Sequence, residues 1–158
     1  MQAEHLLIQH ATRRDAPIVV DLVGRLLSEL GGFQTFDAAT ALPLCEELLS
    51  TEHYLALLAR DHHGVPVGVL TLQACPALYV AGYVGWIQEF YVIPEARSLG
   101  VGHRLLVEAD TYAQERHWQR LEVNTPDITS WPRTVAFYRR EGFTGQSSHL
   151  RKTPGATR

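Results

Sequence analysis

The most informative segment of the chain is Arg97-Ser98-Leu99-Gly100-Val101-Gly102, a loop of the form R-x-x-G-x-G. It lies between an apolar strand that ends at residues 92–94 and an amphipathic helix that begins near Gly100. Glycines let successive backbone N–H groups turn toward one anion, and the helix adds its unsatisfied first-turn donors and positive dipole end. The segment predicts a pyrophosphate site with Arg97 as a fixed cation at its mouth. A helix start that needed glycine only for a turn is the alternative.

Two flanking motifs give this loop a context. Residues 86–97 read W-I-Q-E-F-Y-V-I-P-E-A-R, and with the glycines and Leu105-Leu106 they resemble the acetyl-CoA-binding core of the GNAT superfamily of N-acyltransferases. Residues 135–143 read V-A-F-Y-R-R-E-G-F and resemble the late helix of that family, which ends in F-Y-x-x-x-G-F. A weaker match, from Ile8 to Pro17, resembles the family's opening strand and first helix entry. Only residues 31–50 have no counterpart.

The resemblance implies an α/β (α+β) fold. In the GNAT fold a central mixed, mostly antiparallel sheet is flanked by about four helices. Its fourth and fifth strands splay into a V-shaped cleft for the pantetheine arm of the cofactor. We therefore expect this architecture over residues 1–152 as a single domain, followed by a frayed tail at 153–158.

Size and charge agree with a small enzyme domain. The chain has 158 residues, 46% of them hydrophobic, which is enough for one buried core. A net charge of −3 gives no reason to expect a nucleic acid or an anionic membrane as partner. Because no apolar run approaches the roughly 20 residues of a membrane span and the N-terminus lacks a signal-peptide profile, we expect a cytoplasmic protein. Cys45 and Cys75 are read as buried free thiols.

Periodicity predicts the order of the elements. A short strand at 6–8 precedes a helix that starts from a capping box at Thr12 and runs to Leu30. A second helix is expected near Thr40, because Pro43 is tolerated in a first turn. Its predicted buried face comprises Leu44, Cys45, Leu48 and Leu49.

Strands at 54–60 and 67–74 should flank a turn at 61–66, where His62 and His63 are read as solvated residues and no metal is expected. A strand at 83–92 then leads into the glycine loop and its helix. A strand at 120–124, a helix that begins at Pro132, and a last strand from Phe143 complete the order. The helix after the loop should bury one stripe, consisting of Val101, Leu105, Leu106, Ala109, Tyr112 and Ala113.

Acetyl transfer to an amine needs a group that removes a proton from the ammonium. Glu89 is the only carboxylate between Tyr83 and Ile93 and is the candidate base, provided that its aromatic neighbours desolvate it. Many family members place the acidic base one residue earlier, where this chain has Gln88. The base is therefore Glu89, a water held by Gln88, or a residue elsewhere, and a solvated strand residue is the alternative reading of Glu89.

The cofactor contacts follow from the loop and the preceding strand. Backbone groups of Phe90, Tyr91 and Val92 are expected to pair with the pantetheine as an added strand would. The family also polarises the thioester carbonyl with an N–H on this strand, here that of Tyr91 or Val92. The pyrophosphate is expected on Arg97, Ser98, Leu99, Gly100, Val101 and Gly102.

Tyr138 occupies the family position for the acid that protonates the leaving thiolate, and a phenol with a pKa of about 10 can donate that proton. A tyrosine that only packs beside Phe137 is the alternative. The family often has a cofactor-contacting asparagine seven residues earlier, where this chain has Trp131. Asn124 is the residue expected to replace it.

The acceptor pocket should draw on aromatic residues near the cleft, Phe33, Trp86 and Trp131, with Phe36 and Tyr79 as further candidates, although simple core packing explains aromatics equally well. The predicted function is acetyl transfer from acetyl-CoA to a primary amine of a small molecule or of a protein or peptide, by direct attack in a ternary complex. A non-catalytic acyl-CoA-binding or sensor domain is the second hypothesis. Family habit and the aromatic surplus suggest a homodimer.

Overall fold

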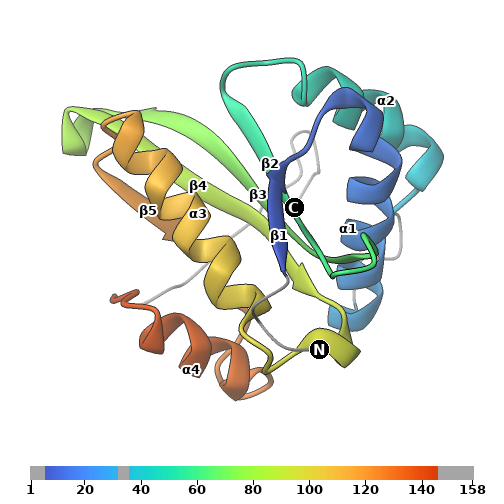
Figure 1. The fold of residues 1–158 in the computed structure, drawn as a ribbon. Helices are drawn as coiled ribbons and strands as arrows, with labels where there is room; N and C mark the ends of the chain where they lie inside the picture. The colour runs from blue at the N-terminus through green and yellow to red at the C-terminus, as the bar shows by residue number, and fades with distance from the viewer. Residues whose placement is uncertain (1–5, 32–35, 146–158) are drawn as a thin grey trace, which may run out of the picture. The chain divides into compact units, whose positions relative to one another are not determined.

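The computed structural model describes residues 6–31 and 36–145. The chain forms two compact units, residues 1–122 and residues 123–158. The elements along the chain are β1 (Leu7–His10), α1 (Ala16–Leu30), α2 (Ala38–Leu48), β2 (Tyr54–Arg60), β3 (Pro66–Ala77), β4 (Gly82–Val92), α3 (Val101–Glu115), β5 (Arg120–Val123) and α4 (Pro132–Arg140) (Figure 1). The first unit holds the elements through α3, and α4 belongs to the second.

The five strands form one sheet in the order β1-β2-β3-β4-β5. The first four strands pair antiparallel with their neighbours. β5 instead runs in the direction of β4, since the Gln119 N–H donates to the Tyr83 carbonyl at 2.8 Å and Leu121 lies against Gly85. The sheet is therefore mixed and mostly antiparallel, and with four helices it confirms the expected fold class. β4 continues to Val92, whereas β5 ends at Val123.

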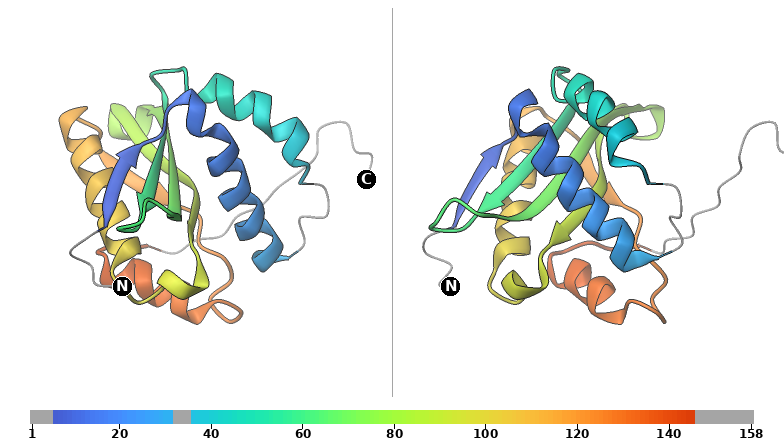
Figure 2. Two further views of the ribbon diagram at one scale, coloured as in Figure 1. Left: turned by 45° about the vertical axis from the view of Figure 1, so that its right-hand side comes forward. Right: turned by 90° about the vertical axis from the view of Figure 1, so that its right-hand side faces the viewer.

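Helices cover both faces of the sheet. On one face α1 and α2 contribute Val19, Leu22 and Cys45 to a core that includes Val69 of β3 and Tyr91 of β4. Figure 1 shows α3 on the opposite side of the strands, and the views of Figure 2 agree. Because side chains alternate along a strand, Gly68 faces α3, where an added Cβ would lie 3.2 Å from Leu105.

The stripe predicted for α3 is confirmed, because all six residues are buried. The expected span of β2 is also confirmed. The predicted capping box is present, but it caps a 3-10 turn at Arg13–Asp15 that leads directly into α1; in it the Asp15 carboxylate accepts the Thr12 N–H at 2.9 Å.

The prediction for α2 is wrong at its start. The helix begins at Ala38 because the Asp37 side chain accepts the Ala39 N–H at 3.1 Å, and this cap places Pro43 inside the helix. The predicted buried face of α2 is wrong only at Leu44, which is 56% exposed, whereas Cys45 is buried as predicted and Leu48 and Leu49 are partly buried.

The last predicted strand is not seen in the part of it that the structure describes. Residues 143–145 are irregular, and the remainder of that strand and the tail at 153–158 lie outside the described residues. Among the helices of residues 6–31 and 36–145, none has the length and apolar character that crossing a membrane requires.

Candidate active site

The glycine loop has the backbone that an anion site requires. Ser98 and Gly100 both adopt left-handed conformations, with φ of 62° and 82°, and Gly100 is the N-cap of α3. Left-handed residues are uncommon outside glycine, and in such turns successive N–H groups converge on one point. The first N–H groups of α3 have no acceptor within the helix, so they add to this concave donor surface. The sequence prediction of a phosphate-binding backbone is consistent with this geometry.

Arg97 is not a free cation at the mouth of this loop. Its Nε donates to the Val92 carbonyl at 2.9 Å, and its terminal nitrogen lies 2.6 Å from a Glu29 carboxylate oxygen. The guanidinium also lies 5.6 Å from the ring centre of Tyr91. Arg97 thus connects the end of β4 to the last turn of α1, and its partner Glu29 reduces the charge that it offers to a ligand.

A β-bulge interrupts β4 just before the loop. Leu70 pairs with Phe90, but Leu72 pairs with Ile87, so β4 carries one extra residue and both Gln88 and Glu89 stand opposite Thr71. This irregularity was not predicted, because it depends on the pairing of two strands. Bulges redirect side chains, and they are frequent beside active sites.

Thr71 holds Glu89 at the bulge because its hydroxyl both accepts and donates a hydrogen bond. The Thr71 hydroxyl accepts the Glu89 N–H at 3.0 Å and donates to the Glu89 carboxylate. Thr71 is fully buried and is the only buried polar side chain in the part of the chain that the structure describes. Our sequence analysis did not single out Thr71, although a lone hydroxyl within the apolar run of residues 67–72 was a usable signal.

Burial raises the pKa of Glu89, and the hydrogen bond from Thr71 opposes that shift. The same negative charge helps to raise the pKa values of two neighbours that burial already raises. These are Cys45 on α2, whose pKa rises to about 11, and the phenol of Tyr54 on β2. Glu89 is therefore a carboxylate in a poorly solvated environment, as the prediction for a general base required.

Three rows of side chains cross the face that α1 and α2 cover. Leu58, Val69 and Tyr91 form a buried apolar row. Ala56, Thr71 and Glu89 follow it, and then Tyr54, Gln73 and Trp86, which are partly exposed. Glu89 thus stands where the core gives way to an open polar surface.

The amides beside this boundary are ordered. The Gln88 Nε2 donates to the Gln73 Oε1 at 2.6 Å, so Gln88 is held by a neighbouring amide. Trp86 lies directly opposite Gln73 and shares its face. This arrangement places Trp86, one of the predicted acceptor residues, on the same face as Glu89.

The strand register also determines which backbone groups of β4 point toward β3 and which point away from it. The Ile93 N–H donates to the Val67 carbonyl at 3.0 Å, and alternate residues of an antiparallel pair point their peptide groups toward the partner. Tyr91 therefore points its N–H toward β3, whereas Val92 points away, consistent with its carbonyl's bond to Arg97. Of the two residues proposed to polarise a thioester, this geometry favours Val92 over Tyr91. Phe90 points its peptide groups the same way as Val92.

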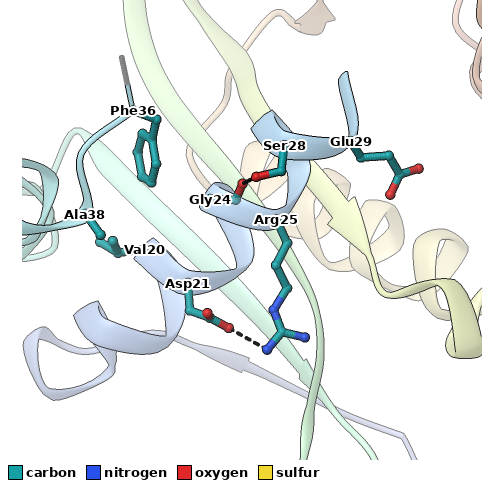
Figure 3. A pocket seen from close by; sticks show the side chains of 8 residues that line it. All are labelled: Val20, Asp21, Gly24, Arg25, Ser28, Glu29, Phe36 and Ala38. Atoms are coloured by element: carbon teal, nitrogen blue, oxygen red, sulfur yellow. Dashed lines mark hydrogen bonds and ion pairs between the residues drawn. The ribbon is translucent and has the colours of Figure 1, made fainter. Parts of the chain in front are cut away.

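A groove of about 660 Å³ lies between α1 and the start of α2 (Figure 3). Asp21, Arg25 and Glu29 give it charged walls, and the Arg25 guanidinium pairs with Asp21 at 2.9 Å. Phe36 lines it as the sequence suggested for the acceptor site, whereas Phe33 lies outside the described residues.

The second unit carries the other predicted residues. Tyr138 is 6% exposed and packs edge-on against Phe143, with ring centres 5.4 Å apart. Burial raises the pKa of the Tyr138 phenol, so it keeps its proton at neutral pH. Asn124 is exposed, and Trp131 is the N-cap of α4.

Comparison with known proteins agrees with this fold and loop. Residues 25–143 match the acetyltransferase (GNAT) family. The chain is 31% identical over 148 residues to the aminoalkylphosphonate N-acetyltransferase of Salmonella typhimurium, with 92% of this chain and 88% of that protein covered. It is 32% identical over 127 residues to an uncharacterized N-acetyltransferase of Schizosaccharomyces pombe, with 77% and 72% covered.

A solved structure shares the fold at lower identity. A predicted acetyltransferase from Clostridium acetobutylicum, solved with acetyl-CoA, superposes with a TM-score of 0.78 at 16% identity and with 94% and 96% of the two chains covered. The protein is thus an enzyme of the acyltransferase class. It belongs to the GNAT acetyltransferase family, and its activity is acetyl transfer.

Proposed function

We propose that the protein transfers an acetyl group from acetyl-CoA to a primary amine of a small molecule, by direct attack in a ternary complex. The observation that carries this proposal is the poorly solvated Glu89 carboxylate, fixed at a β-bulge eight residues before the R-x-x-G-x-G loop. A base is needed because an amine is a nucleophile only after its ammonium form has lost a proton.

The chain's residues fit acetyl-CoA. The N–H groups of residues 98–102 suit its pyrophosphate, and the Val92 N–H, which points away from β3, suits its amide-bearing pantetheine arm, beside Phe90 and Tyr91 of the same strand. When bound, acetyl-CoA supplies the activated acetyl thioester. The Val92 N–H is our candidate for stabilising negative charge on the thioester oxygen.

Glu89 takes the proton from the acceptor amine in this proposal, directly or through a water. Its raised pKa brings it nearer to neutrality, where a base is both ionised and able to hold a proton. Gln88, held by Gln73, has no ionisable group and is assigned to orienting the acceptor or a water.

Tyr138 is proposed as the acid that donates a proton to the leaving thiolate, as the F-Y-x-x-x-G-F ending suggests. Its protonated phenol supports this role. Asn124 stays a proposed cofactor contact, and Trp131 a proposed acceptor contact.

We propose that the acceptor is a small amine rather than a protein, because the relative from Salmonella typhimurium is named for aminoalkylphosphonates. In that case Arg25, in the groove between α1 and α2, offers a cation for an anionic group on the acceptor. Phe36 and Trp86 supply the apolar surface.

The direct test is release of free thiol from acetyl-CoA in the presence of a panel of amines. The panel should contain aminoalkylphosphonates, the matched aminoalkylcarboxylates, uncharged alkylamines and a peptide with a free N-terminus. We expect amine-dependent thiol release that is fastest with the aminoalkylphosphonates. Acetyl-CoA binding without amine-dependent release from any acceptor would instead identify a sensor domain.

A further inference from the structure

Thr71 is the one fully buried polar side chain of residues 6–31 and 36–145, and it has no role in the proposed function. It sits in the middle of β3, between the apolar residues Leu70 and Leu72, and its direct neighbour on β2 is Ala56. A hydroxyl in such a position costs stability unless its hydrogen-bonding capacity is used. Two bonds to Glu89 use the Thr71 hydroxyl, one to its N–H and one to its carboxylate, and the Tyr54 phenol also lies within hydrogen-bonding reach of it.

We propose that Thr71 is the positioning residue of the active site, which holds the β4 bulge and the Glu89 carboxylate in one fixed arrangement. By accepting the Glu89 N–H, the hydroxyl satisfies a backbone donor that the bulge removes from the regular ladder. By donating to one carboxylate oxygen, Oε2, it leaves Oε1 for the proton of the acceptor. This inference rests on the proposed role of Glu89 as the base.

The two bonds have a chemical consequence as well as a geometric one. A hydroxyl that donates to a carboxylate stabilises the ionised form, so the Thr71 contact opposes the rise in pKa that burial imposes on Glu89. Thr71 thus favours the ionised form of a carboxylate that burial would otherwise favour protonating. Without the hydroxyl, Glu89 would titrate at higher pH and a smaller fraction would be available as a base.

Two titratable groups in the described part of the chain face Glu89, and neither interferes with a measurement of the Glu89 pKa. They are Tyr54 from β2 and Cys45 from α2, and the pKa of each is raised. Both are therefore protonated throughout the range in which Glu89 titrates. Neither of these two neighbours therefore adds a titration step to that of Glu89 in this range.

The test compares Thr71→Val, which keeps the shape and removes the hydroxyl, with Thr71→Ser, which keeps the hydroxyl. Protein carrying ¹³C in its glutamate carboxyl groups would be titrated by NMR, with Glu89→Gln used to assign the Glu89 signal. We expect the Glu89 titration to move to higher pH in Thr71→Val and to stay near the wild-type position in Thr71→Ser. Thr111→Val serves as a control, because the Thr111 hydroxyl bonds only the Val107 carbonyl, on the exposed surface of α3.

Kinetics supply the second readout. At a pH within the acidic limb of the kcat/KM profile, Thr71→Val should lose roughly tenfold in kcat/KM, and Thr71→Ser should restore most of it. An unchanged Glu89 titration in a folded Thr71→Val protein would overturn the inference. A different result would overturn the proposed function, namely full activity of Glu89→Gln. In that case the NMR titration would still show whether Thr71 lowers the pKa of Glu89. If Thr71→Val does not fold, Thr71→Ala and Thr71→Ser provide the same comparison.

Discussion

The glycine loop begins eight residues after Glu89 of the β4 bulge, yet the two features depend on different kinds of sequence information. The loop is local: the conformations of Ser98 and Gly100 and the start of α3 follow from residues within a few positions of each other. The bulge is non-local, because it exists only through the pairing of β4 with Thr71 on β3. The proposed cofactor site is therefore predictable from one segment, whereas the geometry of the proposed base depends on two strands.

The largest effect is expected from Glu89→Gln, which keeps the shape and the bulge but removes the base. We predict that kcat/KM for the acceptor falls roughly 10²- to 10⁴-fold, as for the loss of a general base. Acetyl-CoA affinity, measured by calorimetry, should change little, because the loop is intact. Glu108→Gln, which removes a surface carboxylate of α3 that pairs with His10, is the matched control. A Glu89→Gln enzyme with wild-type kcat/KM would show that the bulge does not carry the base.

Tyr138→Phe tests the acid in the second unit. We predict a fall in kcat of roughly 10²-fold with acetyl-CoA affinity nearly unchanged, because the hydroxyl is needed only as sulfur acquires charge. Phe143→Leu perturbs the packing of the same ring and is the control for a structural effect. Wild-type kcat in Tyr138→Phe, where chemistry limits the rate, would remove this residue from the mechanism.

A smaller effect is expected from Gly100→Ala. The added Cβ disfavours the φ of 82°, so the loop loses its arrangement of N–H groups and acetyl-CoA should bind about tenfold more weakly. Gly64→Ala is a closely matched control, because Gly64 has a φ of 79° in the distant β2–β3 turn. Equal affinities of these two variants for acetyl-CoA would exclude the loop from the cofactor site.

The smallest effect on acetyl-CoA affinity is expected from substitutions of Arg97 and of its partner Glu29. Arg97→Ala should weaken acetyl-CoA binding roughly two- to fivefold and reduce its dependence on salt, because an exposed cation–phosphate contact is weak and screened. Glu29→Gln should leave the affinity unchanged or raise it, since it releases the guanidinium from its carboxylate. If Glu29→Gln weakens binding as much as Arg97→Ala does, Arg97 acts only as a tie between α1 and β4.

Sequence reasoning succeeded where the determinants are local. The six-residue stripe of α3 and the span of β2 follow directly from periodicity, and both are confirmed. It failed for α2, because the cap at Asp37 outweighs the cost of Pro43 inside the helix. It selected Glu89 for its charge. The lone hydroxyl of Thr71 in an apolar strand marked that residue as unusual, but its partner Glu89 is defined only by the pairing of β3 with β4.

The backbone assignment on β4 shows the same limit. The sequence left Tyr91 and Val92 as equal candidates for polarising the thioester. The strand register favours Val92, because the hydrogen bond from Ile93 to Val67 sets which peptide groups face β3. The direction of a peptide group in a strand depends on how the strand pairs with its neighbour, so it cannot be predicted from one segment of sequence.

The central claim, that the bulge of β4 presents Glu89 as the base, is tested most directly by the pH dependence of kcat/KM. The profiles of wild type and Glu89→Gln should each be measured with two acceptors whose ammonium groups have different pKa values. The limb of the profile that reflects deprotonation of the acceptor then shifts in pH from one acceptor to the other. In the wild type we predict an additional acidic limb, above the usual glutamate range and independent of the acceptor, because the pKa of Glu89 is raised and only its ionised form accepts a proton. In Glu89→Gln that limb should be absent, and an identical limb in both proteins would contradict the account.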